Sequence, residues 1–128
     1  MGILKSEVVA VTTTGVAGSG AGNANSSPFV GEIVGFTINH DPNAPSTTDL
    51  TITDRRTGVT ILNMNNANTD VYVTPRKVAV DSTNTNILAS TANALWPTPY
   101  IVDQGVNVAI AQGNSITNHC VVTVHYRR

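Results

Sequence analysis

Three histidines, one cysteine and eight carboxylates are the side chains of this chain that could do acid–base, nucleophilic or metal chemistry. His40 directly precedes Asp41, and such a pair could form part of a hydrolase triad. No reactive-serine motif accompanies the pair, which stands in a turn with two prolines. Because Asp in a turn commonly bonds its own backbone, the pattern favours a structural turn over a catalytic pair.

His119 and Cys120 are adjacent, and they could supply a thiol nucleophile or two metal ligands. Neighbours on one strand point to opposite faces, so they cannot both face one ligand. His125 is six residues beyond His119, and this even spacing predicts that the two histidines share a face. Two histidines without further ligands are a weak zinc signature, and a lone Cys120 is typical of a core. The sequence therefore predicts no metal and no cofactor.

An oxygen-rich loop could in principle hold calcium. Its polar residues are Asn63, Asn65, Asn66, Asn68 and Asp70. One carboxylate is too few for a tight site, and the EF-hand spacing is absent. A solvated turn between strands is the favoured interpretation.

Two internal basic pairs are candidates for contact with an acidic protein surface. Arg55 and Arg56 stand at a predicted hairpin tip, and Arg76 precedes Lys77. Nucleic-acid binding would require more positive charge interleaved with aromatic residues. We therefore expect protein contact at these arginines.

Trp96 and Tyr100 flank a segment made rigid and extended by two X-Pro pairs. Such rings, together with Tyr72, could stack on a sugar. Aromatic residues are also enriched at the centres of protein interfaces. Because no second aromatic-rich segment is present, packing or contact with a partner is favoured over sugar binding.

The composition predicts the elements that must position these residues. Val, Ile and Thr supply 44 of the 128 residues, whereas Glu and Lys supply four. β-Branched residues suit a pleated sheet, and the usual lining of solvated helices is almost missing. Charged residues are 12% of the chain and the net charge is −1, which argues against nucleic acid or an anionic membrane as partner. Since no triad, carboxylate pair or metal-ligand set stands out, we expect a protein that is not an enzyme.

Alternation and turn signals predict one all-β domain over residues 1–128, an antiparallel β-sandwich or jelly roll of eight or nine short strands. Residues 1–14 are expected to form an N-terminal arm or edge strand, and 15–28 a flexible loop. Residues 48–64 read as a hairpin, and Gly31 and Gly35 predict a bulge or a close backbone approach. The expected strands cover 7–14, 29–39, 48–54, 59–64, 71–74 with a continuation at 77–81, 106–112 and 119–127.

The N-terminal segment is the most apolar candidate for contact with a partner. Its apolar side chains are Ile3, Leu4, Val8, Val9 and Val11. Such a segment could add to the edge of a neighbouring sheet. No apolar run is long enough to span a membrane, and no signal-peptide core begins the chain. We therefore expect synthesis in a cytoplasm.

Five segments, taken in order, also suggest a family. They are the Gly/Ala/Ser/Asn-rich stretch before Pro28, then Phe29-Val30-Gly31-Glu32-Ile33, Pro45-Ser46-Thr47-Thr48-Asp49-Leu50-Thr51-Ile52, Tyr72-Val73-Thr74-Pro75-Arg76, and finally Val121, Thr123, Val124, Tyr126 and Arg127. In the style and order of these segments the chain resembles the small capsid decoration (cement) proteins of tailed bacteriophages. The resemblance implies a β-sandwich, often trimeric, on the outer face of the icosahedral shell at junctions between capsomers. The resemblance also implies that the partners are the major capsid protein and other copies of the chain. It implies synthesis in a host cytoplasm and a final location on the virion surface. It implies no catalytic residues.

Two other functions fit the same scaffold. One is a carbohydrate-binding or host-attachment module of the virion. Glycan binding that is lost in the variant Trp96→Ala would support this function. The other is a tail or neck component, which would assemble as rings.

Overall fold

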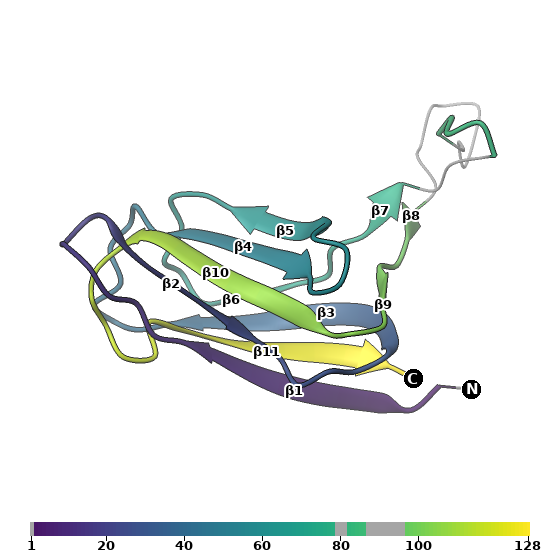
Figure 1. Cartoon of the computed structure of the whole chain (residues 1–128), viewed down its shortest axis with the longest axis horizontal. Coiled ribbons are helices and arrows are strands. Elements are labelled where there is room, and N and C mark those ends of the chain that lie inside the picture. Colours follow the sequence, from purple (N-terminus) through teal and green to yellow (C-terminus); the bar gives the residue numbers. More distant parts are fainter. Residues whose placement is uncertain (1, 79–81, 87–96) are drawn as a thin grey trace.

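Two antiparallel sheets pack face to face in the computed structural model, which describes residues 2–78, 82–86 and 97–128 (Figure 1). One sheet is five-stranded, with order β1-β11-β3-β6 and β9 paired to β3, and the other has order β2-β10-β4-β5. All pairings are antiparallel, so the prediction of an all-β sandwich is confirmed. Within these described ranges, eight strands have three or more residues and three have only two: β1 (Leu4–Val11), β2 (Gly20–Asn25), β3 (Gly31–His40), β4 (Asp49–Asp54), β5 (Thr60–Met64), β6 (Val71–Val73), β7 (Lys77–Val78), β8 (Pro97–Thr98), β9 (Ile101–Val102), β10 (Val106–Gly113) and β11 (Cys120–Arg127).

The core lies between the two sheets and is built by the alternation that the sequence displays. In β10, Val106, Val108 and Ile110 are buried, while the residues between them are only partly covered. β11 buries Cys120 and Val122 in the same way. Complete burial of one Val, Ile or Phe side chain stabilises the fold by about 1.5–3 kcal/mol, so these alternating strands hold the two layers together.

A bulge in β3 confirms the expectation attached to Gly31 and Gly35. Gly35 pairs with His125 and Ile33 pairs with Tyr126, which leaves Val34 as an extra residue on β3. A Cβ built on Gly35 would lie 2.8 Å from the backbone carbonyl oxygen of Val73 and 2.7 Å from the hydroxyl oxygen of Tyr72, and because the carbonyl belongs to a paired strand, glycine is needed for this close approach.

The predicted hairpin at 48–64 is confirmed as β4 and β5. Leu50 pairs with Met64 and Ile52 pairs with Leu62. Gly58 in the connection has φ of 76°, a conformation that glycine adopts without strain. The tip of this hairpin carries Arg55 and Arg56, as expected.

The flexible loop expected over 15–28 is wrong for its second half, because Gly20–Asn25 forms β2 at the edge of the four-stranded sheet. The small residues permit a close crossing, and a Cβ on Gly22 would lie 2.2 Å from the carbonyl oxygen of Thr12. Side-chain amides add to the backbone ladder, since Asn107 Nδ2 donates to Asn23 at 3.2 Å and to Asn25 at 2.9 Å.

The segment after β6 leaves the five-stranded sheet. The sequence predicts that the strand ending at Pro75 continues over 77–81, but Lys77 and Val78 instead pair with Thr98 and Pro97 in a separate two-stranded ribbon, and residues 79–81 lie outside the described residues. This β7–β8 ribbon projects from the body of the sandwich (Figure 1). No helix in the described ranges is long and apolar enough to cross a membrane.

Candidate interaction surface

One end of the sandwich, which we call the terminal end, carries both chain termini (Figure 1). Here β1 begins, β11 ends and β3 begins, with Leu4 paired to Arg127 and Arg127 paired to Glu32. The opposite end, where Cys120 pairs with His40, we call the histidine end. The ribbon β7–β8 and the β4–β5 hairpin tip also lie at the terminal end, so segments distant in sequence meet there.

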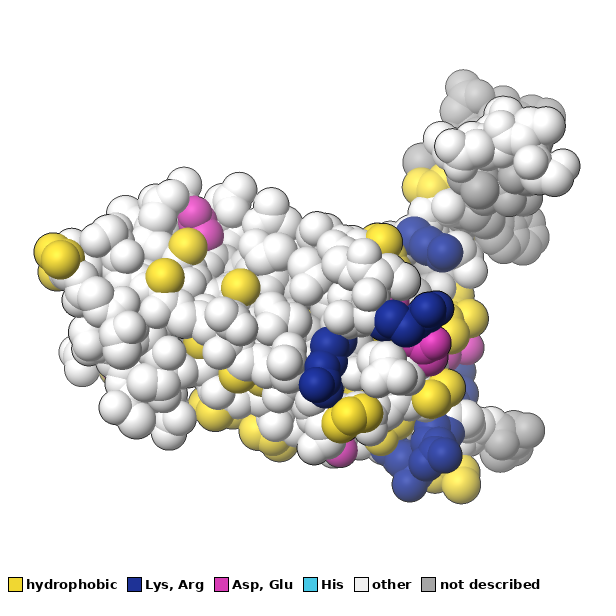
Figure 2. Space-filling view, viewed as in Figure 1, with side chains coloured by type: hydrophobic (Ala, Val, Ile, Leu, Met, Phe, Trp, Pro, Cys, Tyr) yellow, Lys and Arg dark blue, Asp and Glu magenta, His cyan; other side chains and the backbone are white. Residues whose placement is uncertain are grey.

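All seven lysines and arginines lie in the half of the molecule that contains the terminal end. In Figure 2 the Lys and Arg side chains gather beside the termini and at the base of the ribbon, and the other end of this face carries none. The seven are Lys5, Arg55, Arg56, Arg76, Lys77, Arg127 and Arg128.

The carboxylates do not follow the same distribution. The terminal half holds four of those in the described residues (Glu7, Glu32, Asp54 and Asp103), whereas the histidine end holds Asp41, Asp49 and Asp70. Among the described side chains, the terminal half therefore has an excess of three positive charges and the histidine end an excess of three negative ones. A nearly neutral chain thus carries a polarised surface, which favours one orientation on a charged partner.

Hydrogen bonds hold three of the arginines in place. Arg56 Nε donates to the carboxylate of Asp103 at 2.8 Å, and both side chains are about half exposed. Arg55 donates to the carbonyl of Ser26 at 3.2 Å. Arg76 donates to two backbone carbonyls at 3.2 and 2.8 Å. Because carbonyl partners leave the cationic charge uncompensated, Arg55 and Arg76 keep their charge available to an acidic partner.

Exposed apolar side chains gather at the same end. Ile3, Leu4, Val30, Val59 and Ile101 are each between 55% and 71% exposed. They come from the start of β1, the segment before β3, the β4–β5 hairpin and β9. Exposed apolar side chains interspersed with charged ones are typical of a protein–protein contact.

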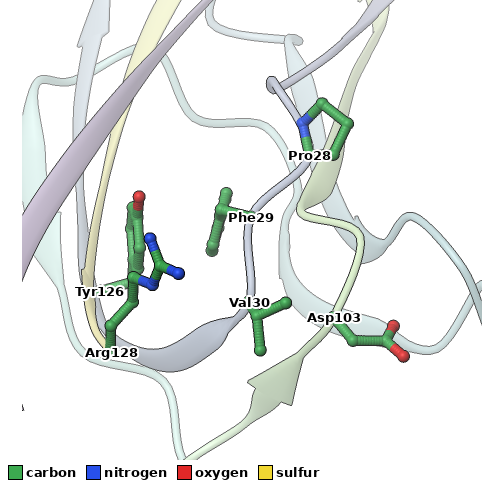
Figure 3. A pocket seen from close by; sticks show the side chains of 6 residues that line it. All are labelled: Pro28, Phe29, Val30, Asp103, Tyr126 and Arg128. Carbon is green, nitrogen blue, oxygen red and sulfur yellow. The ribbon is translucent and has the colours of Figure 1, made fainter.

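A shallow pocket of about 230 Å³ opens at the terminal end (Figure 3). Phe29 and Tyr126 form one side, with their rings stacked at 4.0 Å between centroids. The guanidinium of Arg128 lies beside these rings, and the carboxylate of Asp103 points away from them (Figure 3). The pocket is smaller than the usual ligand cleft of roughly 300–1,000 Å³, and its size suits a single side chain of a partner.

The sequence-predicted contact residues are only partly brought together. Ile3, Leu4, Arg55 and Arg56 meet at the terminal end, with Arg76 at the base of the ribbon and Tyr100, partly buried, packing against the core. Val8 is exposed on the outer face of the five-stranded sheet.

Val9 was wrongly expected to contact a partner. It is 2% exposed and belongs to the core, because alternate residues of β1 face inward. Trp96 lies outside the described residues. Val30, Val59 and Ile101 were not predicted as contact residues, because each is an isolated apolar residue beside a turn. Only the strand pairing shows that the three lie at the same end of the sandwich.

The expectation that His119 and His125 share a face is wrong. His119 lies in the turn before β11, where Asn118 has φ of 52°, and its ring is buried beside Gly113. His125 lies on the outer face, where its Nε2 is 2.8 Å from the Thr37 hydroxyl. The strand alternation does not extend into the turn, so the even spacing between His119 and His125 does not determine which face His119 occupies.

Two buried histidines lie at the histidine end. All four ring nitrogens of His40 and His119 are buried without a hydrogen-bond partner among the described residues. Burial lowers the pKa of both rings; Asp70 and Asp41 oppose this shift at His40 and His119 respectively, and His119 adds to it at His40. Both rings are therefore held neutral.

The oxygen-rich loop is tied to its surroundings. Asp70 accepts the backbone N–H of His40 at 2.7 Å, and Asn68 donates to the carbonyl of Ala44 at 2.8 Å. Within the described ranges, no three His, Cys, Asp or Glu side chains are placed to hold a metal ion.

Cys120 is expected to resist alkylation in the folded protein. It is fully buried, and burial raises the pKa of its thiol from 9.0 to about 12. Because the thiolate is the reactive form and its fraction at pH 8 falls about tenfold for each unit of pKa, reaction with iodoacetamide should be about 1,000-fold slower in the folded chain than in denaturant. Mass spectrometry over a time course measures both rates, and equal rates would contradict the burial of this thiol.

No protein-family model matches the chain, and a comparison with curated proteins finds no match.

Proposed function

We propose that this chain is a structural protein of a bacteriophage virion that binds the outer surface of the assembled capsid at junctions between capsomers. The observation that supports this proposal is the terminal end, where all seven cationic side chains and five exposed apolar ones gather. The proposal also rests on the resemblance of the sequence segments to capsid decoration proteins. Its action is contact, with the terminal end against the major capsid protein.

The polarised charge selects the chemistry of the partner surface. An excess of positive side chains at one end is complementary to an acidic surface of the coat protein, and it repels a basic one. The exposed apolar side chains of this end would then lose their contact with water. The shallow pocket beside Arg128 would receive one side chain of the coat protein.

Stabilisation of the shell follows from selective binding. A protein that binds the assembled lattice, but not free coat subunits, shifts the equilibrium towards assembly. Many identical sites on one shell multiply a modest contact into a large total effect. A rigid sandwich suits this task because it loses little conformational freedom on binding.

Removing positive charge at the hairpin tip is expected to weaken binding to heads. The double variant Arg55→Gln and Arg56→Gln should lower the affinity for purified heads about tenfold, and the loss should shrink as salt is raised. Co-sedimentation with heads that lack the chain measures the affinity.

The matched control changes the net charge by the same amount at the other end. Ser19→Glu and Asn43→Glu place two charges on exposed residues near the histidine end, and they should leave binding near the wild-type value. If both double variants bind equally well, or if the wild-type chain does not bind heads, the proposal fails.

A further inference from the structure

Strand β1 forms a free edge of the five-stranded sheet. It pairs with β11 on one side over Leu4–Val11, and no strand in the described part of the chain pairs with its other side. The edge contains no proline. Leu4 and Val8 on this strand are 64% and 63% exposed. A long free edge with exposed apolar side chains is a template for adding another strand.

The hydrogen-bonding pattern fixes which backbone groups are free. Ile3 and Arg128 exchange two hydrogen bonds, at 3.0 and 3.1 Å. In an antiparallel ladder such pairs alternate with pairs that do not bond. The N–H and C=O groups of Leu4, Ser6 and Val8 therefore point away from β11, towards the free edge.

A second copy of the chain fits this edge in one symmetric register. If a two-fold axis passes beside Ser6, the free groups of Leu4 face those of the partner copy's Val8, and Ser6 faces its own equivalent. Each free N–H of Leu4, Ser6 and Val8 then meets a free C=O, since residues of the same parity are paired. The exposed side chains of Leu4 and Val8 also meet across the junction.

Charge complementarity selects this register over its neighbours. With the axis at Ser6, Lys5 of each copy lies opposite Glu7 of the other copy, so each dimer contains two such pairs of opposite charge. Moving the axis to Lys5 would place two lysines opposite each other, and moving it to Glu7 would place two glutamates opposite each other. Opposite charges across strands are favourable and like charges are destabilising, so of these three registers only the one at Ser6 pairs opposite charges and avoids repulsion.

We propose that two copies of this chain associate through antiparallel pairing of their β1 strands about a two-fold axis at Ser6, which joins their five-stranded sheets into one. This two-fold pair replaces the three-fold self-association that the resemblance implies. It requires no capsid and no other partner, so it stands independently of the function proposed above.

Light scattering across a concentration series tests the pairing. A single strand junction buries less than about 1,200 Å², which is typical of weak association, so the mass should rise from monomer to dimer with concentration. Lys5→Glu and Glu7→Lys should each weaken the dimer about tenfold or more, because each replaces two attractive pairs by two repulsive ones. The double variant restores opposite charges and should recover the wild-type dissociation constant.

Ser6→Pro provides a second, independent variant. Proline removes the N–H that points to the free edge, and a strand edge tolerates proline on its unpaired side. The variant should remain folded by circular dichroism but monomeric at every concentration. A wild-type chain that stays monomeric would show that Lys5 and Glu7 protect the edge instead, and would overturn the proposal. A dimer that none of these variants weakens, or single-variant losses that the double variant does not repair, would also overturn it.

Discussion

Lowering the pH from 7 to 5 is expected to destabilise the folded chain steeply. His40 and His119 are 9% and 0% exposed, and their ring nitrogens have no hydrogen-bond partner among the described residues. Burial lowers the pKa of both below the ordinary value of 6.5. Protonation therefore has to place a positive charge in the core or unfold the chain.

The direction of the effect follows from proton binding. Below pH 6.5 the unfolded chain protonates both histidines while the folded chain keeps them neutral, so the unfolded state binds more protons. Each ring then removes up to about 1.4 kcal/mol of unfolding free energy for each pH unit. The contribution of the two rings is complete above pH 6.5 and is lost as the pH falls towards their folded-state pKa values.

Urea unfolding at a series of pH values measures this slope. His119→Leu should reduce the slope between pH 6.5 and 5 by about half, because one of two proton-binding sites is removed. It should cost little at pH 7.5, since Leu leaves no unpaired buried nitrogen. His125→Gln removes a histidine outside this buried pair, and the slope that the pair produces should persist. An unchanged slope in His119→Leu would refute the assignment.

Gly22→Ala is expected to destabilise the fold by about 3 kcal/mol or more. A Cβ at this position would lie 2.2 Å from the carbonyl oxygen of Thr12 and close to the backbone of Thr13. Overpacking costs typically about 1–3 kcal/mol even where side chains can move. Here the obstacle is backbone, so β2 would have to separate from the end of β1.

Chemical denaturation measures this loss, with Ala21→Ser on the same strand as the control. Ala21 is exposed, and a surface substitution of this kind usually changes stability by less than about 0.5 kcal/mol. A Gly22→Ala chain as stable as the control would mean that β2 does not cross Thr12 this closely.

The sequence predicts those parts of the fold in which alternation is complete. β10 and β11 are recognisable because every second residue is Val, Ile or another core residue, and the hairpin at 48–64 has both strands and a glycine turn. β2 is not recognisable, because glycine, alanine and asparagine do not alternate in hydrophobicity. Its place comes from pairing with β10 and from the crossing at Gly22, which are tertiary features.

The candidate surface could be predicted only in fragments. Ile3, Leu4 and the pair Arg55–Arg56 were identified as contact residues from their types. That they share one end with Arg128 and Ile101 depends on where β1, β4, β9 and β11 begin and end in the sheets. Likewise, the burial of His119 depends on the φ of Asn118, which no sequence pattern specifies.

A cryo-EM reconstruction of the intact virion tests the central claim most directly, because it shows both the place and the orientation of the chain. The expected result is sandwich-shaped density on the outer face of the capsid at junctions between capsomers, with the terminal end against the coat protein and the histidine end facing solvent. Density for the chain in the tail or neck, or a sandwich that contacts the shell through its histidine end, would contradict the account.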